Sequence, residues 1–173
     1  MTPSTLQLKG RAWVFGDNID TDLLAPGHAM RKPIEQLSKH CLEAISPDFA
    51  ASVQHGDILV AGDGFGAGSS REQAAEALLF LGISAVLARS VARIFYRNAL
   101  NLGLPVVRFA DAAQIGQLDL LSVDLVQGRV QDLTTLAEYR HEPIPAFLLD
   151  MLLDGGLLPH LHKRLHPHSA QQD

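Results

Sequence analysis

Short apolar runs alternate with helix-like segments over the first two thirds of the chain. The runs typical of strands are RAWVFG (11–16), DILVAG (57–62), SAVLA (84–88) and LPVVRF (104–109). Between them, SREQAAEALLFLGI (70–83) and SVARIFYRNALN (90–101) space apolar residues at helical intervals. Gly82, near the end of the first segment, and Gly103, just after the second, are expected to end the helices. This β-α-β-α-β order predicts a parallel sheet covered by helices.

Other patterns flank this central unit. Residues 33–45, PIEQLSKHCLEAI, have helical spacing, and residues 145–156, PAFLLDMLLDGG, are typical of a last apolar helix that ends at two glycines. Residues 122–134, SVDLVQGRVQDLT, alternate with period two around a Gln-Gly pair, which predicts a hairpin. We expect one domain over residues 1–162 and a loose polar tail over 163–173.

The composition limits the class of protein. The 173 residues are 47% hydrophobic and 19% charged, with a formal net charge of −5, which is ordinary for a globular chain. Basic residues do not alternate with aromatics as a nucleic-acid surface would require. No apolar run reaches the roughly 18 residues of a membrane span, and the first residues lack a signal-peptide core. We therefore expect a cytoplasmic protein with no nucleic-acid or membrane partner.

Cys41 is the only cysteine. One thiol cannot form an internal disulfide and cannot by itself hold an iron–sulfur cluster or a zinc knuckle. We expect Cys41 to be a small buried residue on the helix at 33–45, which has Pro33 at its first position.

The most distinctive stretch is GDGFGAGSSREQA, residues 62–74. A glycine-rich loop between a strand and a helix exposes backbone N–H groups next to the positive end of the helix, and both favour an anion. Ser69, Ser70 and Arg71 add two hydroxyls and a guanidinium, which suits a carboxylate or a phosphate. Alternatively, the glycines only permit a tight turn, and Ser69 caps the helix in a capping box with Glu72. The loop alone leaves both interpretations open.

Three known nucleotide or catalytic motifs fit this loop poorly. No lysine follows the glycines as in a P-loop, and no serine lies in a G-x-S-x-G pattern. The dinucleotide fingerprint matches formally at Gly62, Gly64 and Ala67, but no ribose-binding acid follows the next strand. A dinucleotide-binding oxidoreductase domain therefore stays an alternative.

Three separated segments carry a more specific resemblance. They are GDNIDTDLLAP, DILVAGDGFGAGSSREQAAEAL and GISAVLARSVARIFYRNALNLGLPV. In order and spacing they resemble the small subunits of 3-isopropylmalate dehydratases, the swivel-domain partners in the aconitase superfamily. The resemblance implies an α/β fold: a three-layer swivelling β/β/α domain with a mostly parallel sheet. It also implies a hydro-lyase or isomerase that acts on a hydroxylated di- or tricarboxylate. The partner is a large subunit that carries a [4Fe-4S] cluster, and this chain is expected to bind no metal.

The resemblance assigns roles within the glycine loop. The first serine of the family's Gly-Ser-Ser-Arg motif is the catalytic base and corresponds to Ser69, while Ser70 and Arg71 correspond to positions that hold a substrate carboxylate. A serine alkoxide needs preorganised N–H donors, and a planar guanidinium can bind a carboxylate with two hydrogen bonds. The glycines expected to build this anion cradle are Gly64, Gly66 and Gly68. The chain departs from the usual family pattern at Gly64, Ala67 and Gln73, where Asn, Cys and His are common.

The resemblance also extends to the segment before the first helix. It implies that Thr21 and Asp22 lie near the active-site entrance as substrate-binding residues, and that the loop LLAPGHAMRKP (23–33) reaches over the variable group of the substrate. There Arg31 is expected to bind a further carboxylate, and His28 or Met30 to shape the side-chain pocket. A solvated Arg31 stays an alternative.

Two other groups of residues have patterns that suggest a site. Arg93 and Arg97 lie four residues apart on a predicted helix, which suits an anion site, a subunit contact or a solvated face. Four histidines near the C-terminus are expected to belong to the loose tail rather than to a metal cluster. They are His160, His162, His166 and His168.

The resemblance favours a dehydratase that acts on 3-isopropylmalate in leucine biosynthesis. Citraconate, dimethylmalate and homoaconitate stay alternative substrates, because one methylene in a hydrophobic pocket changes the binding energy by only about 1 to 3 kcal/mol. A non-catalytic regulatory module with the same fold is the third alternative.

Overall fold

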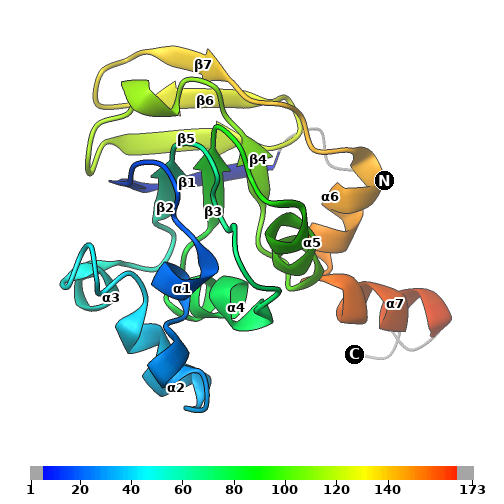
Figure 1. Ribbon diagram of the computed structural model, residues 1–173. Helices are drawn as coiled ribbons and strands as arrows, with labels where there is room; N and C mark the ends of the chain where they lie inside the picture. The colour runs from blue at the N-terminus through cyan, green and yellow to red at the C-terminus, as the bar shows by residue number, and fades with distance from the viewer. Residues whose placement is uncertain (1–5, 167–173) are drawn as a thin grey trace.

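The computed structural model describes residues 6–166, in which seven strands form one sheet (Figure 1). The strands are β1 (Gln7–Val14), β2 (Ile58–Ala61), β3 (Ala85–Ala88), β4 (Val106–Arg108), β5 (Leu120–Asp124), β6 (Arg129–Asp132) and β7 (Glu138–Arg140). Their order across the sheet is β4-β3-β2-β1-β5-β6-β7. Strands β1 to β4 pair in parallel, as predicted, and β5 to β7 extend the sheet with antiparallel pairs. The predicted hairpin is the β5–β6 pair, and β7 has no counterpart in the sequence prediction.

The sheet is buried on both faces where it lies in the middle of the molecule. Along β2, Ile58 and Val60 belong to a core shared with β5, whereas Leu59 and Ala61 belong to a core shared with the helices. Successive side chains of a strand point to opposite faces, so this alternation places β2 between two layers. Figure 1 shows β5 to β7 on one side of the parallel strands and the helices α4 and α5 on the other. The expected β/β/α layering is therefore present.

Helices lie in the connections between the parallel strands and after the last strand. They are α1 (Thr21–Leu24), α2 (Ile34–Leu37), α3 (Phe49–Ser52), α4 (Glu72–Phe80), α5 (Arg93–Asn101), α6 (Ala146–Leu153) and α7 (Leu157–Leu165), with 3₁₀ turns η1 (Gly27–Ala29), η2 (Ser38–His40) and η3 (Ala112–Gln114). Gly82 and Gly103 adopt positive φ just after α4 and α5, as the sequence predicts. Over residues 6–166 no helix has the length and apolar character to cross a membrane.

The single helix predicted over residues 33–45 is wrong. The chain forms α2, continues as η2, and then becomes extended at Cys41. Leu42 has a φ of +60°, and its N–H donates to the Leu23 carbonyl over 2.8 Å. Both Cys41 and Leu42 are fully buried, so their packing and this bond to α1 override the local helical pattern. Cys41 is buried as expected but not helical, and Pro33 precedes α2 as its N-cap.

Two predicted boundaries also differ from the structure. Helix α4 begins at Glu72 with Arg71 as its N-cap residue and no side-chain cap, so the proposed capping box at Ser69 does not form. Helix α7 continues to Leu165, so the boundary before Lys163 falls inside a helix. Lys163 Nζ and His160 Nδ1 each lie 2.7 Å from a carboxylate oxygen of Asp154, and these contacts fasten α7 to the end of α6. His168 and the rest of the expected tail lie outside the described residues.

Candidate active site at the glycine loop

The glycine-rich loop lies at the carboxyl end of β2 and leads into α4. Gly64, Gly66 and Gly68 have φ values of +72°, +73° and +112°, a region that favours glycine. A Cβ on Gly66 would lie 2.3 Å from Cγ of Phe95 on α5, so a side chain cannot be placed there without movement. The predicted strand–loop–helix unit is therefore present, and its three glycines are required by backbone conformation.

Backbone hydrogen bonds fasten this loop to the segment before α1. The N–H of Gly66 donates to the Ile19 carbonyl over 2.7 Å, and the N–H of Thr21 donates to the Ala67 carbonyl over 2.9 Å. These bonds bring residues 19–22 against the loop.

Thr21 positions Ser69 directly. The N–H of Ser69 donates to Thr21 Oγ1 over 3.1 Å, and the two hydroxyl oxygens lie 3.4 Å apart. Thr21 is buried, with 3% of its surface exposed, whereas Ser69 is exposed. The buried hydroxyl of Thr21 thus holds Ser69, whose hydroxyl is accessible at the surface.

Asp22 and α1 position Arg71. Nη1 of Arg71 pairs with the Asp22 carboxylate and also donates to the Ala25 carbonyl over 3.0 Å. The guanidinium has five N–H donors, so these contacts leave donors that can bind an anion. Asp22 therefore contacts Arg71 in the structure, and its expected role in substrate binding stays a prediction.

Further support for the loop comes from residues that the sequence analysis did not single out. Ser90 Oγ accepts from the N–H of Gly64 over 2.8 Å, and Nδ2 of Asn98 on α5 donates to the Ser70 carbonyl over 3.4 Å. Both Ser90 and Asn98 lie in GISAVLARSVARIFYRNALNLGLPV, one of the three segments that carry the family resemblance. The family resemblance of that segment is the sequence feature from which Ser90 and Asn98 could have been identified.

An ion-pair network closes the other end of the loop. Nη2 of Arg89 lies 3.0 Å from Asp17 Oδ1 and 2.7 Å from Asp63 Oδ2. The N–H of Asp63 also donates to Asp17 over 2.7 Å. This backbone hydrogen bond, together with Arg89, holds the pKa of Asp17 below its ordinary value.

The remaining predicted site residues, His28, Met30 and Arg31, have different neighbours from the residues around Ser69. Nε2 of His28 lies 3.2 Å from Glu43 Oε1, and its ring meets that of His40 edge to face at 5.0 Å. Met30 is partly buried against the helix-side core, and Arg31 is exposed. The structure therefore brings together Thr21, Asp22, Ser69 and Arg71, and it engages His28 and Met30 elsewhere.

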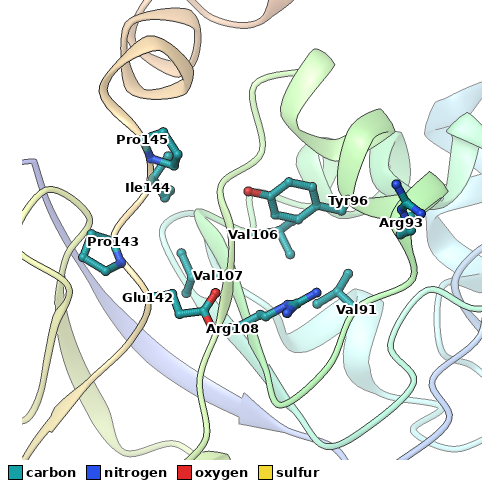
Figure 2. Close-up of a pocket in the computed structure, with 10 residues that line it drawn as sticks. All are labelled: Val91, Arg93, Tyr96, Val106, Val107, Arg108, Glu142, Pro143, Ile144 and Pro145. Atoms are coloured by element: carbon teal, nitrogen blue, oxygen red, sulfur yellow. The ribbon is translucent and has the colours of Figure 1, made fainter.

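A pocket of about 420 Å³ opens between the start of α5, strand β4 and the segment before α6 (Figure 2). Its polar groups belong to Arg93, Tyr96, Arg108 and Glu142, and valine, isoleucine and proline side chains complete the lining. Val91 in its wall forms a β-bridge with Phe65 of the glycine loop. Burial raises the pKa of the Tyr96 hydroxyl, with opposing effects from Arg108 and Glu142. Of the residues considered from sequence, only Arg93 lines this pocket.

Cys41 does not contribute to the site. Its side chain is fully buried, and burial raises the pKa of its thiol, which disfavours the thiolate that metals bind. As the only cysteine, it leaves this chain without a thiolate set for an iron–sulfur cluster.

Comparison with known proteins shows which family the chain resembles. A model of the aconitase C-terminal domain family matches residues 20–112, which include the whole glycine loop. The chain is 51% identical to 3-isopropylmalate dehydratase small subunit 1 of Thermotoga maritima, over 90% of this chain and 95% of that one. It is 47% identical to the methanogen homoaconitase small subunit of Methanothermobacter thermautotrophicus, over 91% and 92% of the two chains.

A solved structure shows the same fold. The crystal structure of a 3-isopropylmalate dehydratase chain from Methanocaldococcus jannaschii superposes with a TM-score of 0.89 at 38% sequence identity. The match covers 96% of this chain and all of that one.

Proposed function

Since the chain belongs to the aconitase C-terminal domain family, as a dehydratase small subunit, we propose that it dehydrates and rehydrates 3-isopropylmalate together with a large subunit, in leucine biosynthesis. The observation that carries this proposal is the Ser69 hydroxyl, exposed beside Arg71 and held by Thr21. A base and a carboxylate-binding cation thus share one loop. The relatives are named as small subunits of dehydratases, which supports a hydro-lyase that needs a second subunit.

Ser69 is the proposed base, and it removes the proton next to a substrate carboxylate. A serine alkoxide is unstable near pH 7 unless hydrogen-bond donors stabilise it. Thr21 Oγ1 already accepts from the Ser69 N–H, so the Thr21 hydroxyl proton can be donated to Ser69 Oγ, 3.4 Å away. Helix α4 begins three residues later, and its N-terminal end adds a favourable positive potential.

Arg71 is the proposed carboxylate ligand. Asp22 and the Ala25 carbonyl fix Nη1, which aims the planar group before substrate arrives. A guanidinium fixed in this way loses little entropy when it forms a bidentate pair with a carboxylate. Ser70, exposed and adjacent, is the proposed second donor to the same group.

The large subunit is proposed to carry the [4Fe-4S] cluster, whose iron supplies Lewis-acid assistance to the departing hydroxyl. The residues of this chain fit a cluster on the large subunit, because the single cysteine of this chain is buried in the helix-side core. A free thiol and an iron–sulfur partner both persist under reducing conditions, so we propose the cytoplasm as the location.

Homoaconitate is the second candidate substrate. The homoaconitase relative favours it, and a tricarboxylate needs one more cation than 3-isopropylmalate does. Arg31, exposed in the loop after η1, is the proposed source of that charge. Citraconate and dimethylmalate, which are small dicarboxylic acids, would use Ser70 and Arg71 alone.

Anaerobic co-purification with a cognate large subunit, followed by turnover assays on these four acids, tests the function. We expect a stable complex that consumes 3-isopropylmalate and shows no activity from either subunit alone. Selective turnover of homoaconitate that is lost in Arg31→Ala would establish the second candidate. A complex inactive on every acid would favour a regulatory module, and absence of a complex together with a thermal shift by NAD would favour a dinucleotide-binding domain.

A further inference from the structure

Two histidines and a glutamate converge between η1 and the end of η2. His28 Nε2 lies 3.2 Å from Glu43 Oε1, and His40 Nδ1 lies 2.7 Å from Glu43 Oε2. One potential ligand atom from each of the three residues lies within 4.8 Å of the others. This cluster contains none of the residues that hold Ser69 or Arg71.

We propose that His28, His40 and Glu43 bind one zinc ion, or a similar divalent transition metal, with water as the fourth ligand. Two imidazoles and one carboxylate are a recurrent zinc ligand set. Metal–ligand bonds of about 2.0 to 2.1 Å in a tetrahedron separate the ligand atoms by about 3.3 Å. The spacing in the cluster brackets that value, so small side-chain rotations would complete the site. The site would bind metal whether or not the chain has the proposed function.

The local backbone holds the ligands in place. His40 and Glu43 flank the buried pair Cys41 and Leu42, and the N–H of Glu43 donates to the His40 carbonyl over 3.2 Å. This is the segment where the predicted helix breaks, so burial of the two residues between them turns both ligands to the same side. His28 approaches from η1, fifteen residues earlier than Glu43.

The cluster is accessible to an ion from solution. The exposed fractions of the side chains are 58% for His28, 28% for His40 and 35% for Glu43. Without metal, a hydrogen bond joins His40 to Glu43 and a charge contact joins His28 to Glu43, and together they keep the ligand atoms close. A metal ion would replace the protons of that group rather than require a new arrangement.

Lys32 is the one cation in contact with this group in the described structure. Its Nζ lies 3.3 Å from His40 Nε2, where it can donate to a neutral imidazole. A metal on Nδ1 would place a proton on Nε2, so the ammonium would have to turn away. Lys32 is exposed on a flexible stem, and its charge is expected to weaken metal binding rather than prevent it.

A bound metal would have a mechanical effect on the loop over the substrate. It would tie η1, which begins the 27–32 stretch, to the segment after η2, which Leu42 fastens to α1. Zinc binding would therefore make this loop more rigid.

Isothermal titration of zinc into the full, untagged chain tests the site. The starting variant carries His162→Ala and His166→Ala, because those two rings lie 4.8 Å apart at the C-terminal end of α7 and form a competing pair. We expect one zinc per chain. His40→Ala and Glu43→Gln should each weaken binding by about 100-fold or more, since even partners of ligands contribute about 10 to 100-fold. His55→Ala, at an exposed histidine outside the cluster, is the matched control and should bind as the starting variant does.

Two further readouts separate a metal site from an ion-pair network. Cobalt should give the visible absorption of a tetrahedral ion, and Lys32→Ala should tighten zinc binding several-fold by removing a nearby positive charge. Absence of stoichiometric zinc binding would overturn the inference. Binding that persists unchanged in His40→Ala and Glu43→Gln, with circular dichroism showing a folded chain, would overturn it equally.

Discussion

The backbone N–H of Ser69 donates to Thr21 Oγ1 over 3.1 Å, and the hydroxyl oxygens of the two residues lie 3.4 Å apart. Because the amide occupies one acceptor position on Thr21, the threonine hydroxyl can use its own proton as a donor to Ser69. A buried residue on α1 thereby controls the orientation of an exposed residue on the glycine loop.

Thr21→Val removes this hydroxyl and preserves the shape of the side chain. We expect kcat of the reconstituted enzyme to fall by about 100-fold, the usual effect of losing one donor to a developing anion, with a smaller change in KM. Thr21→Ser keeps the hydroxyl and should retain most of the activity. Steady-state kinetics on both variants measure this, and equal activity in Thr21→Val and the parent enzyme would exclude a role for the contact.

Arg71→Lys tests the carboxylate site. Lysine keeps the charge but loses the bidentate geometry and the simultaneous contacts with Asp22 and the Ala25 carbonyl. Hydrogen bonds to charged groups contribute about 1.5 to 3 kcal/mol, so we expect KM to rise by about 10 to 100-fold. An unchanged KM for the dicarboxylate substrate would place its binding elsewhere.

Gly66→Ala should destabilise the fold. The new Cβ would lie 2.3 Å from the Phe95 ring at a φ of +73°, and overpacking of this kind costs about 1 to 3 kcal/mol. Urea unfolding of the chain gives the free energy of unfolding. Gly16→Ala is the matched control, because its added methyl group would have no neighbouring atom within 4 Å, and it should unfold like the parent protein.

Asp57 makes stability depend on pH. Burial alone would raise the pKa of this carboxylate, but hydrogen bonds from Arg11, the Gln54 N–H and Trp13 Nε1 outweigh it and lower the pKa. The unfolded chain therefore binds the proton more readily than the folded one. The stabilisation is present above the ordinary pKa of about 3.9 and is lost as the pH falls through the lower folded value.

Asp57→Asn removes the contribution of Asp57 to the pH dependence of stability. We expect a loss of about 2 kcal/mol at pH 7, because the charged hydrogen bonds with Arg11 weaken. The difference between variant and parent should shrink as the pH is lowered from about 5 to about 3. Urea unfolding across this range measures it, and a difference that stays constant with pH would contradict the assignment.

The strand–loop–helix unit could be predicted because its signals are local. The strand residues ILVA (58–61) are all apolar because β2 is buried on both faces, and the loop glycines are needed for positive φ. The helix over 33–45 could not be corrected from sequence, because the buried Leu42 is held by a bond to Leu23 on another element. The contact between Thr21 and Ser69 joins residues 48 apart in the sequence, and only the tertiary fold brings them together.

Ser69→Ala, assayed with the large subunit under anaerobic conditions, tests the central claim most directly. We expect the complex to form with a nearly unchanged KM and kcat to fall by about 1000-fold or more, because the base is lost. Ser52→Ala, at an exposed serine on α3, is the control and should be fully active. Full activity in Ser69→Ala would contradict the claim that Ser69 is the base, and would mean that the glycine loop does not supply the base of the reaction.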